Sequence, residues 1–584
     1  MKPFLEEHWV ITILAAAIGL IFVFPHIYLR TVDRSFFRGV DVLGSDAETH
    51  YVARMQEVYD GHLLLGSTYF WEGKNQPYLP PPFLEIVVAY LGKILGMDAV
   101  QINIFAKFLF GFLLSLLLYF FVLELFGDKY LALLSSALTL LAPSLLSSSD
   151  LRSVFSWEVK NLEFLRYARP INPAFSSLLL FGYLLSLHRL ISPVTRLGLV
   201  ITRPSLVMAF QIRYLIFCVV LLGFSFYAYF YFWTYLLLAN GLFIFWFIYN
   251  RNWAGVKKII FIFIGAILIA LLYLIHTVGV SGLSGYQETS ERLGFFISRS
   301  PVVSKLAIVT AFLVVFAFYK KLPSFNIFFI ITFAASILVI NHQIITGVNI
   351  QNDHYHWYII TPLAGIAIIS TFYFYVLGIL NKKIFNALVG ALLVSFFLTG
   401  IIVQAKSYFG LRGIIILNQR YAPVLEWLKL NTSRDSVVFA DNKLSELIPA
   451  YTHNNVYYSA YAPYYLNSQE DLENRFFLRL FFEGVNSENV TSYLDEHRSD
   501  TALYLFGLKY RYTNGCSSCF PDELNKNLAK KYTEFLKEDF ITQTKKYRLD
   551  YIVWDKLENT EWHLPLDKIE KLFEAGDINV YKLR

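Results

Sequence analysis

The chain has 584 residues, of which 56% are hydrophobic, 18% aromatic and only 16% charged, and its formal net charge is +6. Soluble domains carry about a quarter of charged residues, so this composition excludes a soluble globular enzyme and a disordered chain. Three cysteines are too few for a disulfide scaffold. The composition therefore predicts a polytopic α-helical membrane protein.

Eleven apolar segments are candidates for membrane-spanning helices, which need about 20 mostly apolar residues. The first, 9–29, is too long for a signal-peptide core and no small-residue cleavage site follows it, so we expect it to be retained. A largely polar stretch over 30–100 comes next. The remaining spans are expected at 101–126, 131–147, 173–190, 213–228, 233–250, 258–279, 302–319, 323–341, 358–380 and 385–404.

The short loops divide into a basic set and a mixed set, which predicts the orientation in the membrane. The basic set holds Lys129, Arg189, Arg196, Arg203, Arg213, Arg251, Lys257, Lys258, Lys320, Lys321, Lys382 and Lys383. The alternate loops, 148–170, 280–301 and 341–357, are mixed or neutral. Because basic loops face the cytoplasm, we expect the N-terminus inside and, after eleven spans, the C-terminal part outside.

After residue 404 the composition changes abruptly, and 405–584 reads as an extracytoplasmic α/β domain following a transmembrane domain over 1–404. The segments APVLEWLKLN and DELNKNLAKKYTEFLKED have a helical pattern. SVVFAD, LDYIVWD and DINVYKLR are typical of short buried strands.

The first outer loop, 30–100, is rich in acidic residues and in helical patterns. AETHYVARMQEVYDG has amphipathic spacing and ends at Gly61, and Asp46 precedes it at an N-cap-like position. Asp46 is therefore either a cap alone or a functional carboxylate. PPFLEIVVAYLGKIL is too short for an obvious span, and we expect a helix on the outer membrane surface.

This organisation resembles the GT-C glycosyltransferases, which include oligosaccharyltransferase catalytic subunits, protein O-mannosyltransferases and the aminoarabinose transferases of lipid A. Asp46, Tyr51 and Gly61 follow an oligosaccharyltransferase spacing, and the run Tyr69-Phe70-Trp71-Glu72-Gly73-Lys74 is similar to a Tyr-Phe-Glu-Lys-Pro segment of the aminoarabinose transferases. The motif match covers about residues 41–100. The resemblance implies a GT-C-like fold and transfer of a sugar from a polyprenyl-phosphate donor to a protein, lipid or glycan acceptor. It also implies that the transfer inverts the configuration of the sugar.

The resemblance implies that an outer-loop carboxylate, Asp46 or Glu48, is the general base that deprotonates the acceptor hydroxyl. Ala47 separates these two residues, and the two family patterns favour different ones. Tyr51, Tyr69 and Arg292 are candidates for substrate binding, although an exposed amphipathic helix also explains Arg292. The second outer loop has no Asp-x-Asp motif, and its acids Asp150, Glu158 and Glu163 are scattered. The sequence leaves both metal-free chemistry and a divalent cation, Mg or Mn, open.

The leaving phosphate is an anion, so nearby cations would stabilise it. The donor-phosphate candidates are Lys74, Arg152, Arg169, His354 and His356, and Lys74 ranks first by its match to the aminoarabinose transferases. Headgroup anchoring is an alternative for Arg169. The cluster around His354 also fits a metal site or an interfacial aromatic belt with Trp357.

Cys516 and Cys519 form an isolated C-x-x-C motif, which two residues cannot complete into a structural zinc site. On the outer face this motif fits a local disulfide.

The leading hypothesis is a membrane glycosyltransferase in the plasma membrane, with a lipid-linked donor and without nucleic-acid partners. A transporter or lipid-linked-sugar flippase, and a non-catalytic membrane assembly protein, are the alternatives. Ion-coupled carriers need ionisable groups within the membrane. Here Lys107 and Glu124 are the main ones in the predicted spans.

Overall fold

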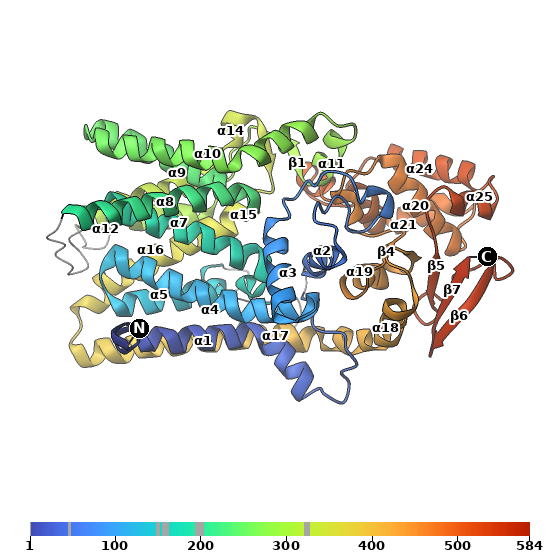
Figure 1. Cartoon of the computed structure of the whole chain (residues 1–584), viewed down its shortest axis with the longest axis horizontal. Coiled ribbons are helices and arrows are strands. Elements are labelled where there is room, and N and C mark those ends of the chain that lie inside the picture. Colours follow the sequence, from blue (N-terminus) through green and yellow to red (C-terminus); the bar gives the residue numbers. More distant parts are fainter. Residues whose placement is uncertain are drawn as a thin grey trace.

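The apolar segments form helices that lie side by side in a bundle, and an α/β domain is joined to one end of it (Figure 1). This computed structural model describes residues 2–44, 48–147, 152, 154, 163–192, 204–320 and 327–583.

Eleven apolar helices of the bundle correspond to the eleven predicted spans. Eight helical stretches are long and apolar enough to cross a membrane: His8–Thr31, Ala99–Phe126, Pro170–Ile191, Met208–Ala228, Phe230–Tyr249, Trp253–Ser281, Asp353–Ile379 and Lys382–Asn431. Three shorter apolar helices are Lys129–Leu141, Lys305–Tyr319 and Ile327–Val339. The predicted class, a polytopic helical membrane protein with a C-terminal domain that contains a sheet, is confirmed.

The bundle helices have the following bounds in the structure. They are α1 (Lys2–Thr31), α4 (Ala99–Phe126), α5 (Lys129–Leu141), α7 (Ser176–Ile191), α8 (Pro204–Ala228), α9 (Phe230–Tyr249), α10 (Trp253–Ser281), α12 (Lys305–Tyr319), α13 (Ile327–Val339), α16 (Thr361–Tyr375) and α17 (Lys382–Leu417).

Glycines let the first two long helices approach closely. A Cβ at Gly19 of α1 would lie 2.7 Å from the ring of Phe108, and one at Gly111 of α4 would lie 2.6 Å from the ring of Phe22. Small residues of this kind allow membrane helices to pack through van der Waals contact. The contact between α1 and α4 fixes the helix that carries Lys107 beside the one that leads into the first outer loop.

The last bundle helix continues beyond the predicted end of its span. α17 has 36 residues, about 54 Å at 1.5 Å per residue, and runs through the predicted boundary at 404. The charged residues Lys406 and Arg412 follow the apolar segment, but the helix continues past them. Hydropathy therefore located the end of the apolar segment, while the helix itself extends into the C-terminal domain.

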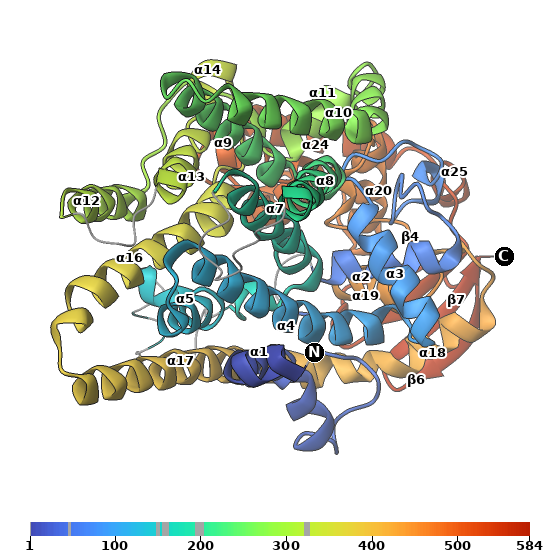
Figure 2. The same ribbon diagram turned by 60° about the vertical axis from the view of Figure 1, so that its left-hand side comes forward.

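The first outer loop holds two short helices at the end of the bundle, as expected. α2 (Glu48–Asp60) ends before Gly61, whose φ is +99°, and α3 (Phe83–Leu95) has only 13 residues. α3 lies across the bundle end and packs on α2, α4 and α8 (Figures 1 and 2). Val87, Tyr90 and Ile94 of α3 are exposed.

Two further loops, 280–301 and 341–357, meet in a small antiparallel ribbon. β1 (Phe295–Ile297) pairs with β2 (Val348–Ile350), with Phe296 opposite Asn349. α11 (Tyr286–Arg292) precedes this ribbon, and α14 (Gln343–Thr346) and α15 (Asp353–Tyr355) flank its second strand. The ribbon holds the loop before α12 beside the loop before α16.

The C-terminal domain has a five-stranded sheet in the order β4-β3-β5-β7-β6. β3 (Val437–Phe439) is parallel to β4 (Asn455–Val456) and to β5 (Tyr551–Asp555), whereas β7 (Ile578–Leu583) is antiparallel to β5 and β6 (Ile569–Ala575). Its helices are α18 (Ala422–Asn431), α19 (Asn442–Tyr451), α20 (Gln469–Phe482), α21 (Val490–Glu496), α22 (Arg498–Thr501), α23 (Lys509–Thr513), α24 (Asp522–Phe535) and α25 (Phe540–Lys545). The two helices and three strands predicted in this domain are present as α18, α24, β3, β5 and β7, and the other elements were not anticipated.

The first outer loop and the C-terminal domain share one hydrophobic core. Val40, Tyr69 and Phe70 of the loop are buried in the same cluster as β3 and β5. The backbone N–H of Val456 donates to the carbonyl of Tyr69 at 3.0 Å. The turned view shows α2 against α19 (Figure 2). The loop is thereby fixed to a domain that lies more than 300 residues further along the chain.

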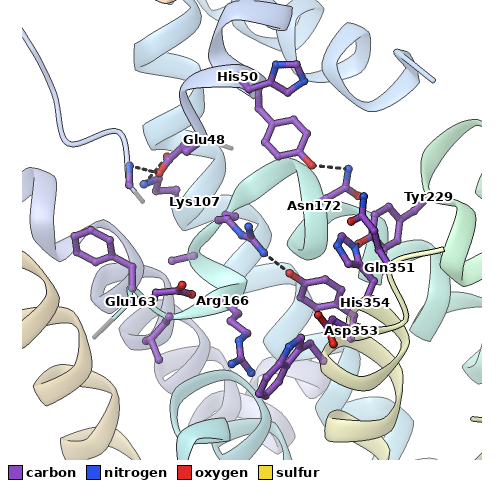
Figure 3. Close-up of a pocket in the computed structure, with 18 of the residues that line it drawn as sticks. Glu48, His50, Lys107, Glu163, Arg166, Asn172, Tyr229, Gln351, Asp353 and His354 are labelled. Carbon is purple, nitrogen blue, oxygen red and sulfur yellow. Dashed lines mark hydrogen bonds and ion pairs between the residues drawn. The ribbon is translucent and has the colours of Figure 1, made fainter. Parts of the chain in front are cut away.

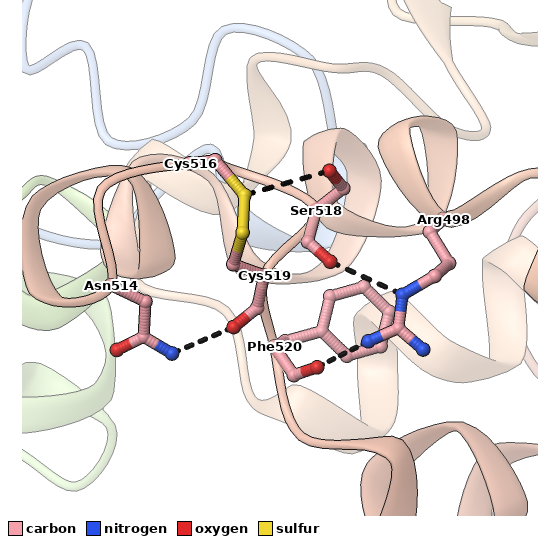
Figure 4. Close-up of a disulfide and its surroundings, with 6 residues drawn as sticks. All are labelled: Arg498, Asn514, Cys516, Ser518, Cys519 and Phe520. Atoms are coloured by element: carbon pink, nitrogen blue, oxygen red, sulfur yellow. Dashed lines mark hydrogen bonds between the residues drawn. A yellow bond between two sulfur atoms is a disulfide. The ribbon is translucent and has the colours of Figure 1, made fainter.

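The predicted local disulfide between Cys516 and Cys519 is present (Figure 4). The side chain of Asn514 donates to the carbonyl of Cys519 at 2.7 Å, and Arg498 donates to the carbonyls of Ser518 and Phe520. These bonds hold the turn that follows α23.

Candidate functional site

A cavity of about 440 Å³ lies between the bundle end and the C-terminal domain (Figure 3). Most of its lining comes from α1 with the first outer loop, the segment 163–172, the loop before α16 and the C-terminal domain, and single residues of α4, α17, the junction between α8 and α9 and the end of α11 complete it. The residues that carry polar or aromatic groups into it are Glu48, His50, Tyr51, Lys107, Glu163, Arg166, Arg169, Asn172, Tyr229, Gln351, Asp353, His354, Trp357, Tyr358, Gln404, Tyr461, Tyr464, Arg511 and Tyr512.

Glu48 is the best-anchored acid in the cavity. Its Oε1 atom lies 2.6 Å from the ammonium of Lys107 and accepts a hydrogen bond from Asn103 at 2.7 Å. Its Oε2 atom accepts a bond from the backbone N–H of Gly44 at 2.7 Å. The side chains of Glu48 and Lys107 are 3% and 6% exposed. Three donors therefore hold this carboxylate in one orientation.

The pKa of Glu48 is lowered although the residue is buried. Burial raises the pKa, but the charges of Lys107 and His26, together with the hydrogen bonds from Lys107 and Gly44, outweigh it. Glu48 is thus a stable anion whose acceptor atoms are occupied by protein donors. It is better suited to fixing the start of α2 than to taking up a proton.

Cations and aromatic rings form the wall opposite Glu48. The guanidinium of Arg166 lies 3.2 Å from the ring centroid of Trp357, and Arg169 donates to the hydroxyl of Tyr358. Stacked or hydrogen-bonded arginines have a fixed orientation and match the geometry of a phosphate. Arg166 and Arg169 give this wall the chemistry of an anion site.

The two predicted histidines differ in position. His354 lines the cavity, hydrogen-bonds to the hydroxyl of Tyr229 and stacks on Tyr231 at a centroid distance of 4.5 Å. His356 is not among the lining residues, and its Nδ1 lies 3.1 Å from Oγ of Ser304. Only His354 is therefore placed to contact a molecule in the cavity.

Two acids line the cavity without a protein partner in the part of the chain that the structure describes. They are Glu163 and Asp353, and Figure 3 shows both carboxyl groups at the cavity. Within those same residues no three His, Cys, Asp or Glu side chains converge as a metal site requires. The described donor set does not fit a divalent cation.

The upper wall is aromatic. Tyr51 accepts a hydrogen bond of 3.4 Å from Asn172, and burial raises the pKa of its hydroxyl to about 12, so it stays protonated. His50 hydrogen-bonds to Tyr69 at 2.9 Å and stacks on Tyr461 at 5.0 Å. Burial and the charge of Arg54 hold the pKa of His50 well below its usual range, so the ring is neutral.

Several predicted site residues lie elsewhere. The ammonium of Lys74 lies 2.7 Å from Glu57 and 2.9 Å from Asp435, so ion pairs use its charge away from the cavity. Tyr69 stands behind His50 and is fully buried. Arg152 is exposed and is not among the lining residues.

Arg292 is a buried connection rather than an exposed helix residue. It is 2% exposed and donates to Thr289 at 2.8 Å and to the carbonyl of Asn467 at 2.5 Å. Burial lowers the pKa of this guanidinium to about 10. Its contacts tie α11 to the C-terminal domain. Because Arg292 is buried, the alternative explanation of an exposed amphipathic helix is wrong for this residue.

Asp46 lies outside the described residues, as do Asp150 and Glu158. The residues on either side of the segment 45–47, Gly44 and Glu48, both line the cavity. Among the candidates that the structure describes, Glu48, Tyr51, Arg169 and His354 line this cavity.

Sequence reasoning missed the contributions of the C-terminal domain. Tyr461, Tyr464, Arg511 and Tyr512 come from loops and a short helix whose local sequence carries no recognisable motif. Lys107 did carry a signal, since a lone cation in an apolar span has a functional or pairing role by default.

No protein-family model matches this chain, and no curated protein matches it. Among solved structures, the chain is similar to the oligosaccharyltransferase of Archaeoglobus fulgidus in the apo form, with 12% identity over 94% of this chain and 70% of that chain and a TM-score of 0.47. It is also similar to ArnT of Cupriavidus metallidurans bound to undecaprenyl phosphate, with 12% identity over 77% of this chain and 85% of that chain and a TM-score of 0.41. The apo state of that ArnT gives 11% identity and a TM-score of 0.41, with coverage of 74% and 84%.

Proposed function

We propose that this chain is a membrane glycosyltransferase that moves a sugar from a polyprenyl-phosphate donor to an acceptor at the outer membrane face. The observation that carries the proposal is the cavity at the bundle end, where Arg166 and Arg169 face the anchored acid Glu48. This arrangement supports a site for an anionic leaving group on one side and, on the other, an anchored acid at the start of the helix that follows the proposed base. The sequence resemblance to the GT-C enzymes leads to the same reaction class.

The position of the cavity suits a lipid-linked substrate. The bundle helices below it are apolar, and residues of α1 and α4 such as Phe22 and Lys107 reach its floor. A polyprenyl tail in the bilayer would bring its phosphate to the level of Arg166 and Arg169. These half-buried cations would stabilise the charge that develops on the phosphate as the sugar departs.

The proposed reaction is one displacement at the anomeric carbon. The acceptor oxygen forms a bond to this carbon, the bond from the carbon to the phosphate oxygen breaks, and polyprenyl phosphate leaves with the electron pair. The acceptor proton passes to a carboxylate of the enzyme, and this carboxylate later releases the proton to water. Attack from the face opposite the phosphate inverts the configuration.

We propose Asp46 as the base and Glu48 as a positioning residue. Glu48 already accepts bonds from Lys107, Asn103 and Gly44, which leaves it poorly suited to receive a proton. Its bond to Gly44 fixes the two ends of the segment that carries Asp46. The acceptor would approach from the C-terminal domain, past Tyr461 and Tyr512.

A transfer assay in lipid nanodiscs tests the proposal. A panel of polyprenyl-phosphate sugars is offered with membrane extract as the acceptor source, and wild type is compared with Asp46→Asn, Glu48→Gln and the exposed control Glu470→Gln. Loss of a general base costs about 10² to 10⁴ in kcat. We expect that loss in Asp46→Asn, a smaller one in Glu48→Gln and none in the control. Equal turnover in all four proteins would refute the site.

A further inference from the structure

A second, smaller cavity of about 180 Å³ lies within the C-terminal domain, apart from the site described above. Its lining residues are Tyr421, Asp441, Asn442, Lys443, Tyr458, Arg479, Glu483, Glu558 and Asn559. None of them lines the larger cavity. We propose that this second cavity binds a single neutral, hydroxyl-rich unit, namely a monosaccharide or one residue of a glycan.

The cavity occupies the place in the sheet where ligands bind in many α/β folds. β4, β3 and β5 are parallel neighbours, and Asp441 follows the carboxyl end of β3. Glu558 and Asn559 follow the carboxyl end of β5. In open sheets with parallel strands, ligands bind in the crevice beyond these ends.

The polar groups of the cavity have unused hydrogen-bonding capacity. Arg479 has a side chain only 8% exposed, and its Nη1 atom is buried without a hydrogen-bond partner in the described part of the chain. Asp441 accepts a bond of 2.8 Å from the N–H of Leu444 through Oδ1, but its Oδ2 has only a 3.4 Å contact with Asn559. A ligand hydroxyl that both donates and accepts would satisfy both groups.

The balance of charges favours a neutral ligand. The lining contains three acids, Asp441, Glu483 and Glu558, and two bases, Lys443 and Arg479. It therefore offers neither a uniformly positive wall to a phosphate nor a uniformly negative wall to a metal ion.

Size and surface fit one sugar ring. A volume of about 180 Å³ holds about six water molecules at roughly 30 Å³ each, which is too little for an oligosaccharide. Tyr421 and Tyr458 add aromatic surface that can pack against the apolar face of such a ring. A site that binds a sugar needs hydrogen-bond donors, hydrogen-bond acceptors and aromatic rings, and this cavity has all three.

Saturation-transfer NMR on the full chain in lipid nanodiscs tests the proposal, because maltoside detergents would supply a sugar headgroup themselves. The probes are methyl glucoside, methyl mannoside, methyl galactoside and N-acetylglucosamine, with inorganic phosphate and Mg²⁺ as charged comparisons. Asp441→Asn is the main variant, since asparagine also caps a helix N-terminus. Lys443→Met is a second variant at a partly exposed position, and Lys537→Met is an exposed control.

We expect saturable binding of at least one of the sugars, weakened about tenfold or more in Asp441→Asn and in Lys443→Met and unchanged in the control. The variants lie away from the larger cavity, so a loss in them assigns the signal to this second site and not to the proposed transferase site. Absence of saturable sugar binding in the wild type would overturn the proposal. Binding that neither variant weakens, or saturation by phosphate or Mg²⁺ instead of a sugar, would overturn it as well.

Discussion

At the residue scale, the pair of Glu48 and Lys107 shows how a buried charge is held at the bundle end. Their 2.6 Å contact joins α2 to α4, and both side chains are almost fully buried. Breaking a buried pair by removing one partner costs about 3 to 5 kcal/mol, because the other charge is left unpaired.

We predict that Lys107→Met lowers the free energy of unfolding by about that amount, and that adding Glu48→Gln recovers part of the loss. The measurement is unfolding in mixed micelles for the two single variants and the double variant. Strictly additive losses would show that the two charges do not interact.

Asp441 gives a pH dependence whose sign follows from its surroundings. Burial and the nearby Asp555 raise its folded-state pKa from 3.8 to about 6. The folded protein therefore holds this proton more tightly than the unfolded chain, and the free energy of unfolding falls as pH rises from about 4 to about 6. A shift of about two pKa units corresponds to about 3 kcal/mol.

We predict that Asp441→Asn removes this decline in the free energy of unfolding. The variant therefore gains stability relative to wild type as the pH rises over that interval, and the difference between the two proteins is constant at higher pH. Asp539 is a matched control because it also caps a helix, α25, but is exposed with a lowered pKa. Asp539→Asn should not reproduce the effect. Parallel pH profiles for wild type and Asp441→Asn would contradict the assignment.

At the scale of elements, the junction between α2 and the C-terminal domain is held by the ion pairs of Lys74 with Glu57 and Asp435. We predict that Lys74→Met lowers the free energy of unfolding by about 3 to 5 kcal/mol, since it leaves Glu57 buried without its cation. The KM for a donor sugar should change little, because Lys74 does not line the larger cavity.

The exposed pair of Lys537 and Glu534 provides the control for this experiment. Its partners are 65% and 60% exposed, and such pairs contribute only about 0 to 1 kcal/mol. Lys537→Met should therefore be nearly neutral. A raised KM in Lys74→Met with unchanged stability would restore the phosphate-binding role that the sequence suggested.

Sequence patterns predicted the elements far better than their contacts. Apolar length located all eleven bundle helices, and periodicity located α2, α3 and α24, because these signals are local. The pairing of Lys74 with Asp435 depends on residues 361 positions apart and leaves no local trace. For the same reason the sequence did not indicate that Tyr461 and Arg511 would lie at the cavity. It did indicate Glu48, because this residue lies next to a recognisable motif.

At the scale of the whole molecule, we propose that the N-terminus and the C-terminal domain lie on opposite sides of the membrane, as the eleven spans predicted from the sequence imply. In Figure 1 the N-terminus and the start of α17 lie toward the end of the bundle away from that domain. Lysines and arginines gather in the loops of that far end, such as Lys382 and Lys383 before α17. From the positive-inside rule we propose that this end faces the cytoplasm.

We predict that a membrane-impermeant maleimide labels Ser487→Cys on intact cells but labels Lys383→Cys only after the cells are opened. Both positions are exposed in the structure. The native cysteines do not interfere, because Cys218 is buried and Cys516 is bonded to Cys519. The reverse labelling pattern would invert the topology and move the proposed site to the cytoplasmic side.

The most direct test of the central claim is the affinity of the purified protein for polyprenyl phosphate, measured by titration in nanodiscs. The variants are Arg166→Gln and Arg169→Gln, and Lys537→Gln is the control cation away from the cavity. Because about 1.4 kcal/mol corresponds to tenfold in Kd, loss of one charged contact should weaken binding about tenfold or more. We predict that weakening in both cavity variants and an unchanged Kd in the control. Equal Kd values in all four proteins would contradict a donor-phosphate site at this cavity.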